Sequence, residues 1–568
     1  MRPKPQSKGF FQPIDPVEAS KSDLEVLFEG RLDNRPELLR ELGLQAVDSQ
    51  SVSDTLLAAE AYRKWGSTCF ERFLGPFAMV VRDRAAQRLV AGRDPLGDRT
   101  LCYHLGSNVL VIGTQPSAVL RHPAVTSRLD EVTLSHFFAV EAPPSGSTFF
   151  ADVRELPPGH TLVYDRQGLH MEPFWSPASL PPIRYRDDRQ YVDHFRALLT
   201  ESIRCRMPST SVPAVLMSGG LDSTSVAALA AGELAKAQPE ARLPVVSWVF
   251  DELTGADERP FMDPMIERFS LEAHRIHGDE DWPLRDLPSW PIHPDAPSQG
   301  LYCRLQNKAY EATKRNATTV LLTGEYGDHL FCDSALWLRG LLAEGRWAES
   351  WRALRQELGS QSLSAALRGS PIRGAVARTL GLRPRHPARA WLTATARRHV
   401  EGEPVGEPLG GTRRRRQPGA LDPRCAHNAS LEVANARRAG IEVRRPFRDR
   451  RLIEFVLSIP AHLLYRPGWS KWILRQAMTG ILPESVRLRR HVSSLLPLAA
   501  RGLVERESVT VHNLLSAPEA LWRRYVRADW LAAVFPHRLR QRQDGIEAVV
   551  PWQCLCGELW TQREGLQP

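Results

Sequence analysis

Residues 213–235 read PAVLMSGGLDSTSVAALAAGELA, so an apolar strand, a glycine-containing turn and an alanine-rich helix follow one another directly. Two glycines let backbone N–H groups approach phosphate oxygens closely. The N-terminus of the following helix adds positive partial charge and unsatisfied N–H donors. Asp222 can hold the Mg²⁺ that phosphate chemistry requires. We therefore predict that the turn binds nucleotide phosphates through Ser218, Gly219, Gly220, Leu221, Asp222 and Ser223.

A second apolar stretch ends in a loop with two carboxylates. Residues 317–333 read ATTVLLTGEYGDHLFCD, so Glu325 and Asp328 come directly after a buried strand. Strands alternate with helices from residue 189 onward, which predicts a parallel sheet in an α/β layer fold. Open sheets of this kind bind ligands at the carboxyl ends of their strands. We therefore expect Asp222 and Asp328 to lie close together. The 213–235 segment contains neither a Walker A ending nor a G-x-G-x-x-G fingerprint.

Several motifs together resemble one enzyme family. SGGLDS resembles the pyrophosphate loop of the N-type ATP pyrophosphatases, which adenylate a carbonyl substrate and release pyrophosphate. The 317–333 loop is similar to the G-E-G-A-D-E loop of asparagine synthetases. EVRRPFRDRRLIEFVLSIP (442–460) resembles their E-x-R-x-P-F-L-D block, and KWILRQAMTGILPESVRLRRH (471–491) resembles their K-x-x-L-R-x-A…L-P…R-x-K block. The resemblance extends from about residue 25 to about residue 500.

The resemblance implies ATP and Mg²⁺ as cofactors, with Asp222 and Asp328 as the two metal ligands. Glu325 matches the active-site glutamate of the family, and Gly324 belongs to the same ATP-binding loop. The expected reaction is adenylation of a carboxylate followed by attack of an amine. Glu325 would orient that amine or take its proton.

The resemblance also implies residues that contact the base and the pyrophosphate. PVVSWVFDE (244–252) matches the strand that flanks the adenine, so Val249 and Phe250 are expected to contact the base. The family lysine that handles pyrophosphate aligns near His491, where this chain departs from the pattern. Arginines next to His491 keep a basic group available there, and Lys471 is a candidate substitute.

The first part of the chain resembles the glutaminase-type domain of the same family, through FEGRLDNRPELLREL, GPFAMVVRD and VAGRDPLGDRTLCYH. The expected fold class is an N-terminal Ntn-type α+β sandwich followed by an ATP-pyrophosphatase domain with a parallel sheet and a helical C-terminal part. A polar stretch that contains proline, residues 176–188, marks the expected boundary. We predict a glutaminase-like domain over 1–180, a synthetase-like domain over 189–568, and a mobile basic insert at about 373–420.

The glutaminase-like domain is expected to be inactive. Glutamine-dependent members begin Met-Cys-Gly, and that cysteine attacks glutamine; here Arg2 follows Met1, and the first cysteine is Cys69. An amine on the substrate itself can replace ammonia. Two related groups work that way: β-lactam synthetases, and lasso peptide cyclases, which close a macrolactam in a precursor peptide. The β-lactam synthetases carry a tyrosine at the Glu325 position, and here the tyrosine is one residue away, at Tyr326.

We therefore predict a lasso peptide cyclase. The alternatives are an asparagine synthetase that uses free ammonia, a β-lactam synthetase-like enzyme and an inactive scaffold. The cyclase resemblance implies three partners: a precursor peptide, a leader-binding protein and a leader protease.

Composition and charge limit the other classes of function. The 568 residues are 42% hydrophobic and 24% charged, with a net charge of +9, as in globular proteins. Much of the positive charge lies in the basic insert, which includes the run 413–416, and no aromatic residues interleave with it as a nucleic-acid platform requires. The eight cysteines form no C-x-x-C pair. We expect no nucleic-acid partner, no membrane span and a cytoplasmic location.

Overall fold

The computed structural model describes residues 23–44, 52–177, 180–297, 300–331, 348, 389–402, 421, 423–466, 468–490, 493–540 and 546–565. The chain forms two compact units. The first comprises Met1–Thr133, Pro143–Pro177 and Ala426–Ser430, and the second comprises Leu134–Ala142, Ala178–Cys425 and Leu431–Pro568. Two short segments, 134–142 and 426–430, therefore belong to the unit opposite to the one that the sequence predicts for them.

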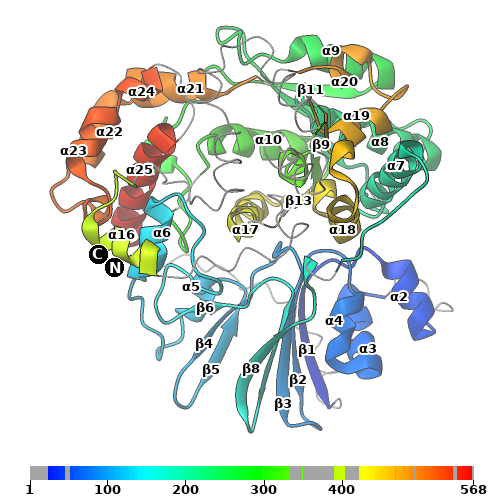
Figure 1. Cartoon of the computed structure of the whole chain (residues 1–568), viewed down its shortest axis with the longest axis horizontal. Helices are drawn as coiled ribbons and strands as arrows, with labels where there is room; N and C mark the ends of the chain where they lie inside the picture. Colours follow the sequence, from blue (N-terminus) through cyan, green and yellow to red (C-terminus); the bar gives the residue numbers. More distant parts are fainter. Residues whose placement is uncertain are drawn as a thin grey trace. The chain divides into compact units, whose positions relative to one another are not determined.

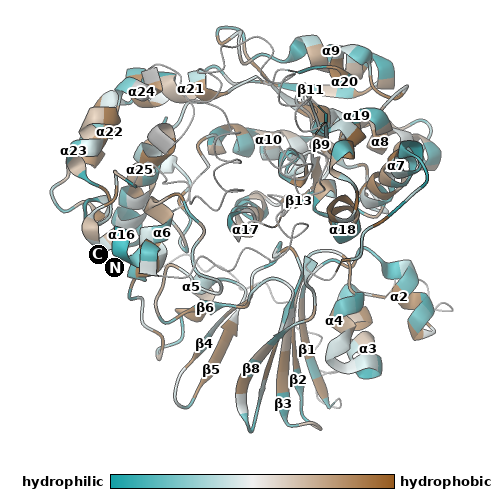
Figure 2. Ribbon diagram, viewed as in Figure 1, coloured by the Kyte–Doolittle hydropathy of each residue, from teal (hydrophilic) through white to brown (hydrophobic). Residues whose placement is uncertain are grey.

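An antiparallel five-stranded sheet forms the centre of the first unit, with the order β1-β2-β3-β7-β8. Alternating apolar residues along these strands bury one face against helices, and Figure 2 shows the apolar colouring of β1, β2 and β3. The phenylalanines Phe70, Phe73 and Phe77 pack there at ring distances of 5.3–6.2 Å. The strands are β1 (Leu24–Gly30), β2 (Phe77–Asp83), β3 (Arg88–Arg93), β7 (His160–Asp165) and β8 (Gly168–Pro173).

Shorter elements complete the first unit. A three-stranded antiparallel sheet has the order β5-β4-β6. Helix α3 begins where the Ser53 hydroxyl accepts a hydrogen bond from the Leu56 N–H at 3.1 Å, as an N-cap residue does. The elements are α2 (Arg35–Leu42), α3 (Asp54–Trp65), η1 (Gly66–Thr68), α4 (Cys69–Arg72), β4 (Cys102–Leu105), β5 (Leu110–Gly113), α5 (Pro116–Val119) and β6 (Arg154–Glu155), with α6 (Glu131–Phe138) crossing into the second unit.

A five-stranded sheet with the order β11-β10-β9-β12-β13 organises the second unit, and every pairing in it is parallel. The predicted parallel sheet is thus confirmed. Strands buried on both faces read as continuous apolar runs, which is the pattern that the sequence shows at PAVLM, PVVSWV and TTVLLT. The strands are β9 (Ala214–Leu216), β10 (Pro244–Val249), β11 (Glu272–His277), β12 (Val320–Thr323) and β13 (Glu442–Arg444).

Helices cover both faces of this sheet (Figure 1). Side chains of α10 and α17 share one apolar cluster with Val246, Leu321 and Val443, and α8 packs against β9 and β12. The helices around the sheet are α7 (Asp188–Arg204), α8 (Leu221–Ala237), α9 (Arg259–Phe269), α10 (Cys303–Arg315), α11 (Gly327–Leu330), α17 (Pro423–Arg438), α18 (Arg450–Ser458), α19 (Trp472–Ala477) and α20 (Glu484–Arg487).

Helices also make up most of the described C-terminal residues, around a second apolar cluster that contains Trp290 and Trp552. None of the described helices is long and apolar enough to cross a membrane. The remaining elements are η3 (Leu287–Ser289), α16 (Ala394–Gly402), η6 (Pro446–Arg448), η7 (Ala461–Leu463), β14 (Tyr465–Arg466), β15 (Trp469–Ser470), α21 (Leu496–Ala500), η8 (Arg501–Arg506), α22 (Ser508–Ser516), η9 (Leu521–Arg524), α23 (Ala528–Val534), α24 (His537–Arg540) and α25 (Ile546–Glu564).

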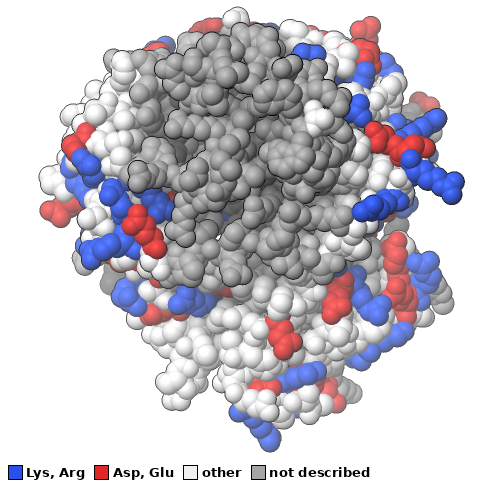
Figure 3. All heavy atoms as spheres, viewed as in Figure 1, with Lys and Arg blue, Asp and Glu red and all other residues white. Residues whose placement is uncertain are grey.

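The basic insert predicted for about 373–420 lies mostly outside the described residues. Its described part, 389–402, contains α16 and is packed. The Trp391 indole N–H donates to the Phe138 carbonyl at 2.9 Å, and Leu392 is fully buried. Residues 389–402 therefore do not form the mobile loop that the sequence predicts. On the face shown in Figure 3, the described Lys and Arg side chains alternate with Asp and Glu instead of forming a basic patch.

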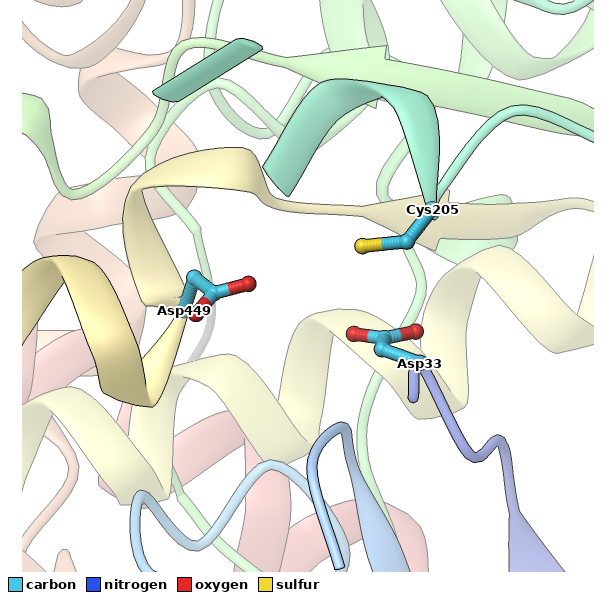
Figure 4. Close-up of side chains that lie close together, drawn as sticks. All are labelled: Asp33, Cys205 and Asp449. Carbon is cyan, nitrogen blue, oxygen red and sulfur yellow. The ribbon is translucent and has the colours of Figure 1, made fainter. Parts of the chain in front are cut away.

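A buried carboxylate ties two helices of the second unit together. Asp449 caps α18 by accepting the Arg451 N–H at 2.9 Å, and its carboxylate also pairs with the Arg206 and Arg451 guanidinium groups at 2.8 Å. Burial alone would raise the pKa of Asp449, but the two arginines lower it well below its ordinary value. Figure 4 shows Asp449 with Cys205, which follows α7. The Asp33 side chain drawn there belongs to the first unit.

Asp449→Asn should destabilise the second unit by about 3–5 kcal/mol at neutral pH, because the buried Arg206 and the partly buried Arg451 lose their charged partner. The depressed pKa makes this stabilisation present above the usual aspartate pKa of about 3.9 and lost as the pH falls below it. Urea unfolding of both proteins between neutral and acidic pH measures the difference. A difference that stays constant down to the lowest pH would contradict the ion-pair explanation.

Candidate active site

The turn between β9 and α8 is shaped by its own serines. The Ser218 and Ser223 hydroxyl oxygens lie 3.0 Å apart, and the Gly220 N–H donates to Ser218 Oγ at 3.2 Å. Helix α8 begins after Gly220 without a side-chain cap. The first turn of α8 therefore presents backbone donors of the kind that bind phosphate. The structure uses the two serines to hold the turn, whereas the sequence suggested them as phosphate donors.

Two glycines bring the loop after β12 directly onto α8. A Cβ atom on Gly324 would lie 2.4 Å from the Ser223 nitrogen, and one on Gly327 would lie 2.4 Å from the Asp222 carboxyl carbon. Real side chains never approach that closely, so only glycine permits this contact. The contact places α11, and with it Asp328, beside Asp222. Gly324 thus has a structural reason to be glycine in addition to its predicted place in the ATP loop.

Gly324→Ala should lower ATP-dependent activity about 100-fold, because the added methyl group pushes the Asp328 loop away from α8 by an ångström or more. The overpacking should also cost about 1–3 kcal/mol of stability. Pyrophosphate exchange and urea unfolding measure the two effects. Gly232→Ala is the matched control, since Gly232 lies on α8, the helix that Gly324 contacts, with no atom within 4 Å of its missing Cβ. Equal activity of the two variants would contradict the close-approach argument.

One lysine joins the two aspartates that the sequence singles out. Lys471 Nζ contacts Asp222 Oδ2, and it lies 2.5 Å from Asp328 Oδ1. Asp222 is 8% exposed, whereas the Asp328 side chain is 77% exposed. Burial, with a further contribution from Asp328, raises the pKa of Asp222 to about 6, although Lys471 opposes the rise. Lys471 adopts a left-handed backbone conformation (φ 55°), an uncommon conformation that occurs more often at functional sites.

The residues present suit a divalent cation. Asp222 Oδ1 is buried and has no hydrogen-bond partner within the described part of the chain, although buried carboxylate oxygens are normally paired. Asp328 brings a second, solvent-facing carboxylate to the same lysine. Mg²⁺ prefers one or two carboxylates together with phosphate oxygens and water. Asp222 and Asp328 would hold such an ion, which neutralises phosphate charge when bound.

Arginine, too, reaches the glycine turn. The Arg489 guanidinium pairs with Glu258 at 2.7 Å, lies 4.0 Å from the centre of the Phe261 ring and is close to Gly219. Glu258 in turn accepts the Gly219 N–H at 3.0 Å. His491 lies outside the described residues, so its predicted role remains a prediction. Lys471 at the aspartates and Arg489 at the turn are basic groups that the structure places at this site.

Glu325 is held by an arginine that follows the neighbouring strand. Arg445 Nε donates to Glu325 Oε2 at 3.0 Å, and its Nη2 contacts Glu432 of α17. Tyr326 has a positive φ of 67°, and Arg448 Cζ lies over its ring, 4.5 Å from the ring centre. These contacts orient the first residues of the Asp328 loop. The site therefore contains a glycine turn, two carboxylates joined by a lysine, and a fixed glutamate.

Comparison with known proteins agrees with this geometry. The asparagine synthase family model matches residues 194–562, which is more than half of the chain. The chain belongs to the asparagine synthase family. A glutamine amidotransferase domain model matches residues 11–175, so an amidotransferase-type domain precedes the asparagine synthase domain. Members of the asparagine synthase family carry out ATP-dependent amidation, and the chain is accordingly an ATP-dependent amide ligase by family.

Individual relatives are distant. The chain is 26% identical over 489 residues to asparagine synthetase [glutamine-hydrolyzing] 3 of Bacillus subtilis (strain 168), covering 82% of this chain and 74% of that protein. It is 23% identical over 320 residues to putative asparagine synthetase [glutamine-hydrolyzing] 2 of Methanocaldococcus jannaschii, covering 55% and 59%. Amidase chyE of Penicillium rubens is 24% identical over 315 residues, covering 53% of this chain and 46% of that protein.

Sequence reasoning missed Arg445 and Glu432. In the family block E-x-R-x-P-F-L-D, this chain reads EVRRPFRD, so Arg445 and Arg448 stand at the variable position and at the leucine. Two arginines that the family pattern lacks, within a mostly buried block, are a signal that could have pointed to Arg445 and its partner Glu432. An arginine next to a buried strand needs a carboxylate partner, and Glu432 is one such partner.

The residues predicted to contact the base are buried. Val249 is fully buried, and Phe250 packs against Ala256, Leu305 and Leu498 with 1% of its surface exposed. The Phe250 backbone is held on both sides: its N–H donates to Asp257, and its carbonyl accepts from Arg259. A base contact through these two side chains therefore requires a change in their packing, and their predicted role stays a prediction.

Proposed function

We propose that this member of the asparagine synthase family is a lasso peptide cyclase. It would adenylate a side-chain carboxylate of a precursor peptide, and the N-terminal amine of the peptide would then close a macrolactam. One observation carries the proposal. The first unit contains two cysteines, Cys69 and Cys102, and both are buried. Burial raises the pKa of the Cys69 thiol to about 12. Only a thiolate attacks glutamine efficiently, so neither cysteine suits ammonia release.

A substrate amine is the nitrogen source that we favour. An amidotransferase-type unit retained without a usable thiol suits a protein whose acceptor amine arrives with its substrate. The basic segment around 413–416, which lies outside the described residues, would suit contact with a peptide. The proposed partners are a precursor peptide, a leader-binding protein and a leader protease, in the cytoplasm. The proposed cofactors are ATP and Mg²⁺.

The residues divide the proposed reaction between them. The turn 218–223 would bind the ATP phosphates, and Asp222 and Asp328 would hold the magnesium ion. A carboxylate oxygen of the peptide attacks the α-phosphorus, and pyrophosphate leaves with its charge neutralised by Lys471 and Arg489. The amine then attacks the acyl carbon, and AMP leaves. Glu325 would orient the amine and accept its proton, while the peptide is held so that both ends meet.

An asparagine synthetase that uses free ammonia is the second candidate. Glu325 occupies the position that the family resemblance gives to the active-site glutamate, and the relatives from Bacillus subtilis and Methanocaldococcus jannaschii are asparagine synthetases by name. Tyr326, by contrast, stacks with Arg448 instead of occupying the Glu325 position, which disfavours a β-lactam synthetase-like site. The two remaining candidates differ in their acceptor amine and can be separated by their products.

Mass spectrometry tests the proposal. The protein is incubated with Mg-ATP, the precursor peptide encoded beside its gene, the leader-binding protein and the protease. A peptide lighter than the cleaved core by one water, formed together with AMP, would establish the cyclase. Asparagine and AMP formed from aspartate and ammonium, with no change in peptide mass, would instead establish the synthetase. The Asp222→Asn protein serves as the inactive control in both arms.

Cys69→Ala should leave product formation within about twofold of the unmodified protein, since the thiol is part of an apolar core and not of a reaction. Its environment is Phe70, Phe73 and neighbouring aliphatic side chains. The measurement compares product formation with glutamine, with ammonium and with neither. Glutamine-dependent activity that disappears in Cys69→Ala would show that the thiol acts as a nucleophile and would remove the main support for a substrate amine.

A further inference from the structure

Arg445 connects three separate elements beside the proposed reaction centre. It follows β13, and its side chain is almost completely buried. One guanidinium nitrogen holds Glu325, which follows β12, at 3.0 Å, and another contacts Glu432 on α17. A planar guanidinium presents its donors in a fixed fork, so two carboxylates bound to it are fixed relative to each other. Glu325 is thereby anchored to a rigid helix through one arginine.

We propose that Arg445 is a positioning residue for Glu325, with Glu432 as the second anchor of the arginine. The inference rests on the proposed function, in which Glu325 orients the attacking amine. Arg445 would act in amide formation and not in adenylation. It forms ion pairs with Glu325 and Glu432, whereas Lys471 pairs with the two predicted metal ligands. In this proposal, the contacts of Arg445 serve amide formation, and the contacts of Lys471 serve adenylation.

Charge balance supports a role beyond packing. The buried Arg445 guanidinium contacts two partly buried carboxylates, and Arg448 adds a second positive charge over the Tyr326 ring. Burial, and then the neighbouring Glu325, raise the pKa of Glu432 to about 8, although Arg445 opposes the rise. A buried carboxylate without a cationic partner is costly. The arginine therefore keeps the Glu325 carboxylate directed, and a neutral side chain would release it.

The position of Arg445 in the chain makes the inference specific to this protein. The family block that it resembles, E-x-R-x-P-F-L-D, leaves position 445 variable and has leucine at position 448. Arginines at both positions surround Tyr326, whose positive φ turns the loop from Glu325 toward Asp328. The two arginines thus add contacts to the Asp328 loop, whose glycines already bring it close to α8.

The test separates the half-reactions. Pyrophosphate exchange reports adenylation, and appearance of the amide product reports attack of the amine. Arg445→Met should lower amide formation about 100-fold, the effect of misplacing a reacting group by about 1 Å, while exchange stays within about threefold. Glu432→Gln should lower amide formation less, by about 3- to 10-fold, because Arg445 keeps its pair with Glu325 but loses its second charged anchor, while exchange stays within about threefold. Equal loss of exchange and amide formation in Arg445→Met would overturn the proposal.

A double variant separates positioning from folding. Arg445→Met alone leaves Glu432 buried without its cation, so the protein could unfold. Arg445→Met combined with Glu432→Gln removes that charge and should restore the urea midpoint while amide formation stays low. Recovery of amide formation in the double variant, or a loss in Glu432→Gln as large as in Glu325→Gln, would overturn the proposal. Arg450→Met, which breaks a 2.7 Å pair with Glu454 on α18, is the matched control.

The test does not depend on the identity of the substrate. Both activities are measured with whichever carboxylate supports exchange, whether a peptide or free aspartate with ammonium. Failure of every peptide to react would refute the cyclase function and leave the ratio of the two activities measurable. A ratio unchanged in Arg445→Met, with any accepted substrate, would refute the positioning role alone.

Discussion

Asp222→Asn should lower pyrophosphate exchange by at least about 1000-fold. The amide is nearly the same size as the carboxylate, so the loss reflects charge and not shape. Asp222 supplies the buried carboxylate next to the phosphate turn, and its Oδ1 has no partner among the described residues. Without that charge, a magnesium ion would be bound poorly, and the phosphates would lose the neutralisation on which phosphoryl chemistry depends.

Two measurements check this explanation of the Asp222 variant. The concentration of Mg²⁺ needed for half-maximal exchange should rise in Asp222→Asn and in Asp328→Asn. Asp263→Asn is the matched control: Asp263 lies on α9, is about half exposed, and pairs with Arg275 at 2.6 Å. It should stay within about twofold of the unmodified protein. Near-normal exchange by Asp222→Asn or Asp328→Asn would contradict the metal assignment.

Lys471→Met should lower exchange about 100- to 1000-fold, as removal of a preorganised donor to developing charge does. Burial works against the charge on Lys471, but Asp222 and Asp328 raise its pKa on balance, so it carries a positive charge between them. In the proposed mechanism, that charge neutralises the leaving pyrophosphate. Because both carboxylates remain in the variant, the Mg²⁺ requirement should not increase, in contrast to the aspartate variants.

The control for Lys471 is Lys236→Met. Lys236 lies near the end of α8, is mostly exposed, and pairs with Glu233 at 2.5 Å. A surface pair of this kind contributes little, and exchange should be unaffected. If Lys471→Met required more Mg²⁺ but reached a normal maximal rate, the lysine would be part of metal binding and not of the leaving-group step.

Local sequence patterns predicted the framework of the site. An apolar run followed by glycines and then an alanine-rich helix has few structural solutions, so the residue pattern alone is enough to recognise the turn at 218–223. The same holds for Asp328, because a buried strand followed by Gly324 and acidic residues ends at the ligand edge of a parallel sheet. Both predictions depend on residues close together in the chain.

Long-range side-chain contacts could not be predicted in the same way. Lys471 was only a substitute candidate, because nothing near it in the chain shows that it reaches Asp222, 249 residues away. Arg445 meets Glu432 because α17 and β13 pack in one apolar cluster. Phe250 directly follows an apolar strand that looked suitable for a base, yet tertiary packing buries its ring against Leu305 and Leu498.

The first unit bears on the source of the nitrogen. Its antiparallel sheet and helices persist in this chain, both of its cysteines are buried, and Cys69 lies in an apolar core. A buried thiol of high pKa is chemically inert. The second unit, by comparison, brings Asp222, Asp328 and Lys471 together after the strands of its parallel sheet. The two units together favour an enzyme that activates a carboxylate and receives its nitrogen from elsewhere.

Isotope transfer from the peptide to AMP tests this division most directly. The acidic side chain of the precursor peptide is labelled with heavy oxygen in its carboxylate, and the reaction is run with Mg-ATP and without glutamine or ammonium. The proposed mechanism predicts that each macrolactam formed leaves one heavy oxygen in AMP, since the carboxylate oxygen attacks the α-phosphorus. Macrolactam formed with unlabelled AMP, or with ADP and labelled phosphate, would contradict it.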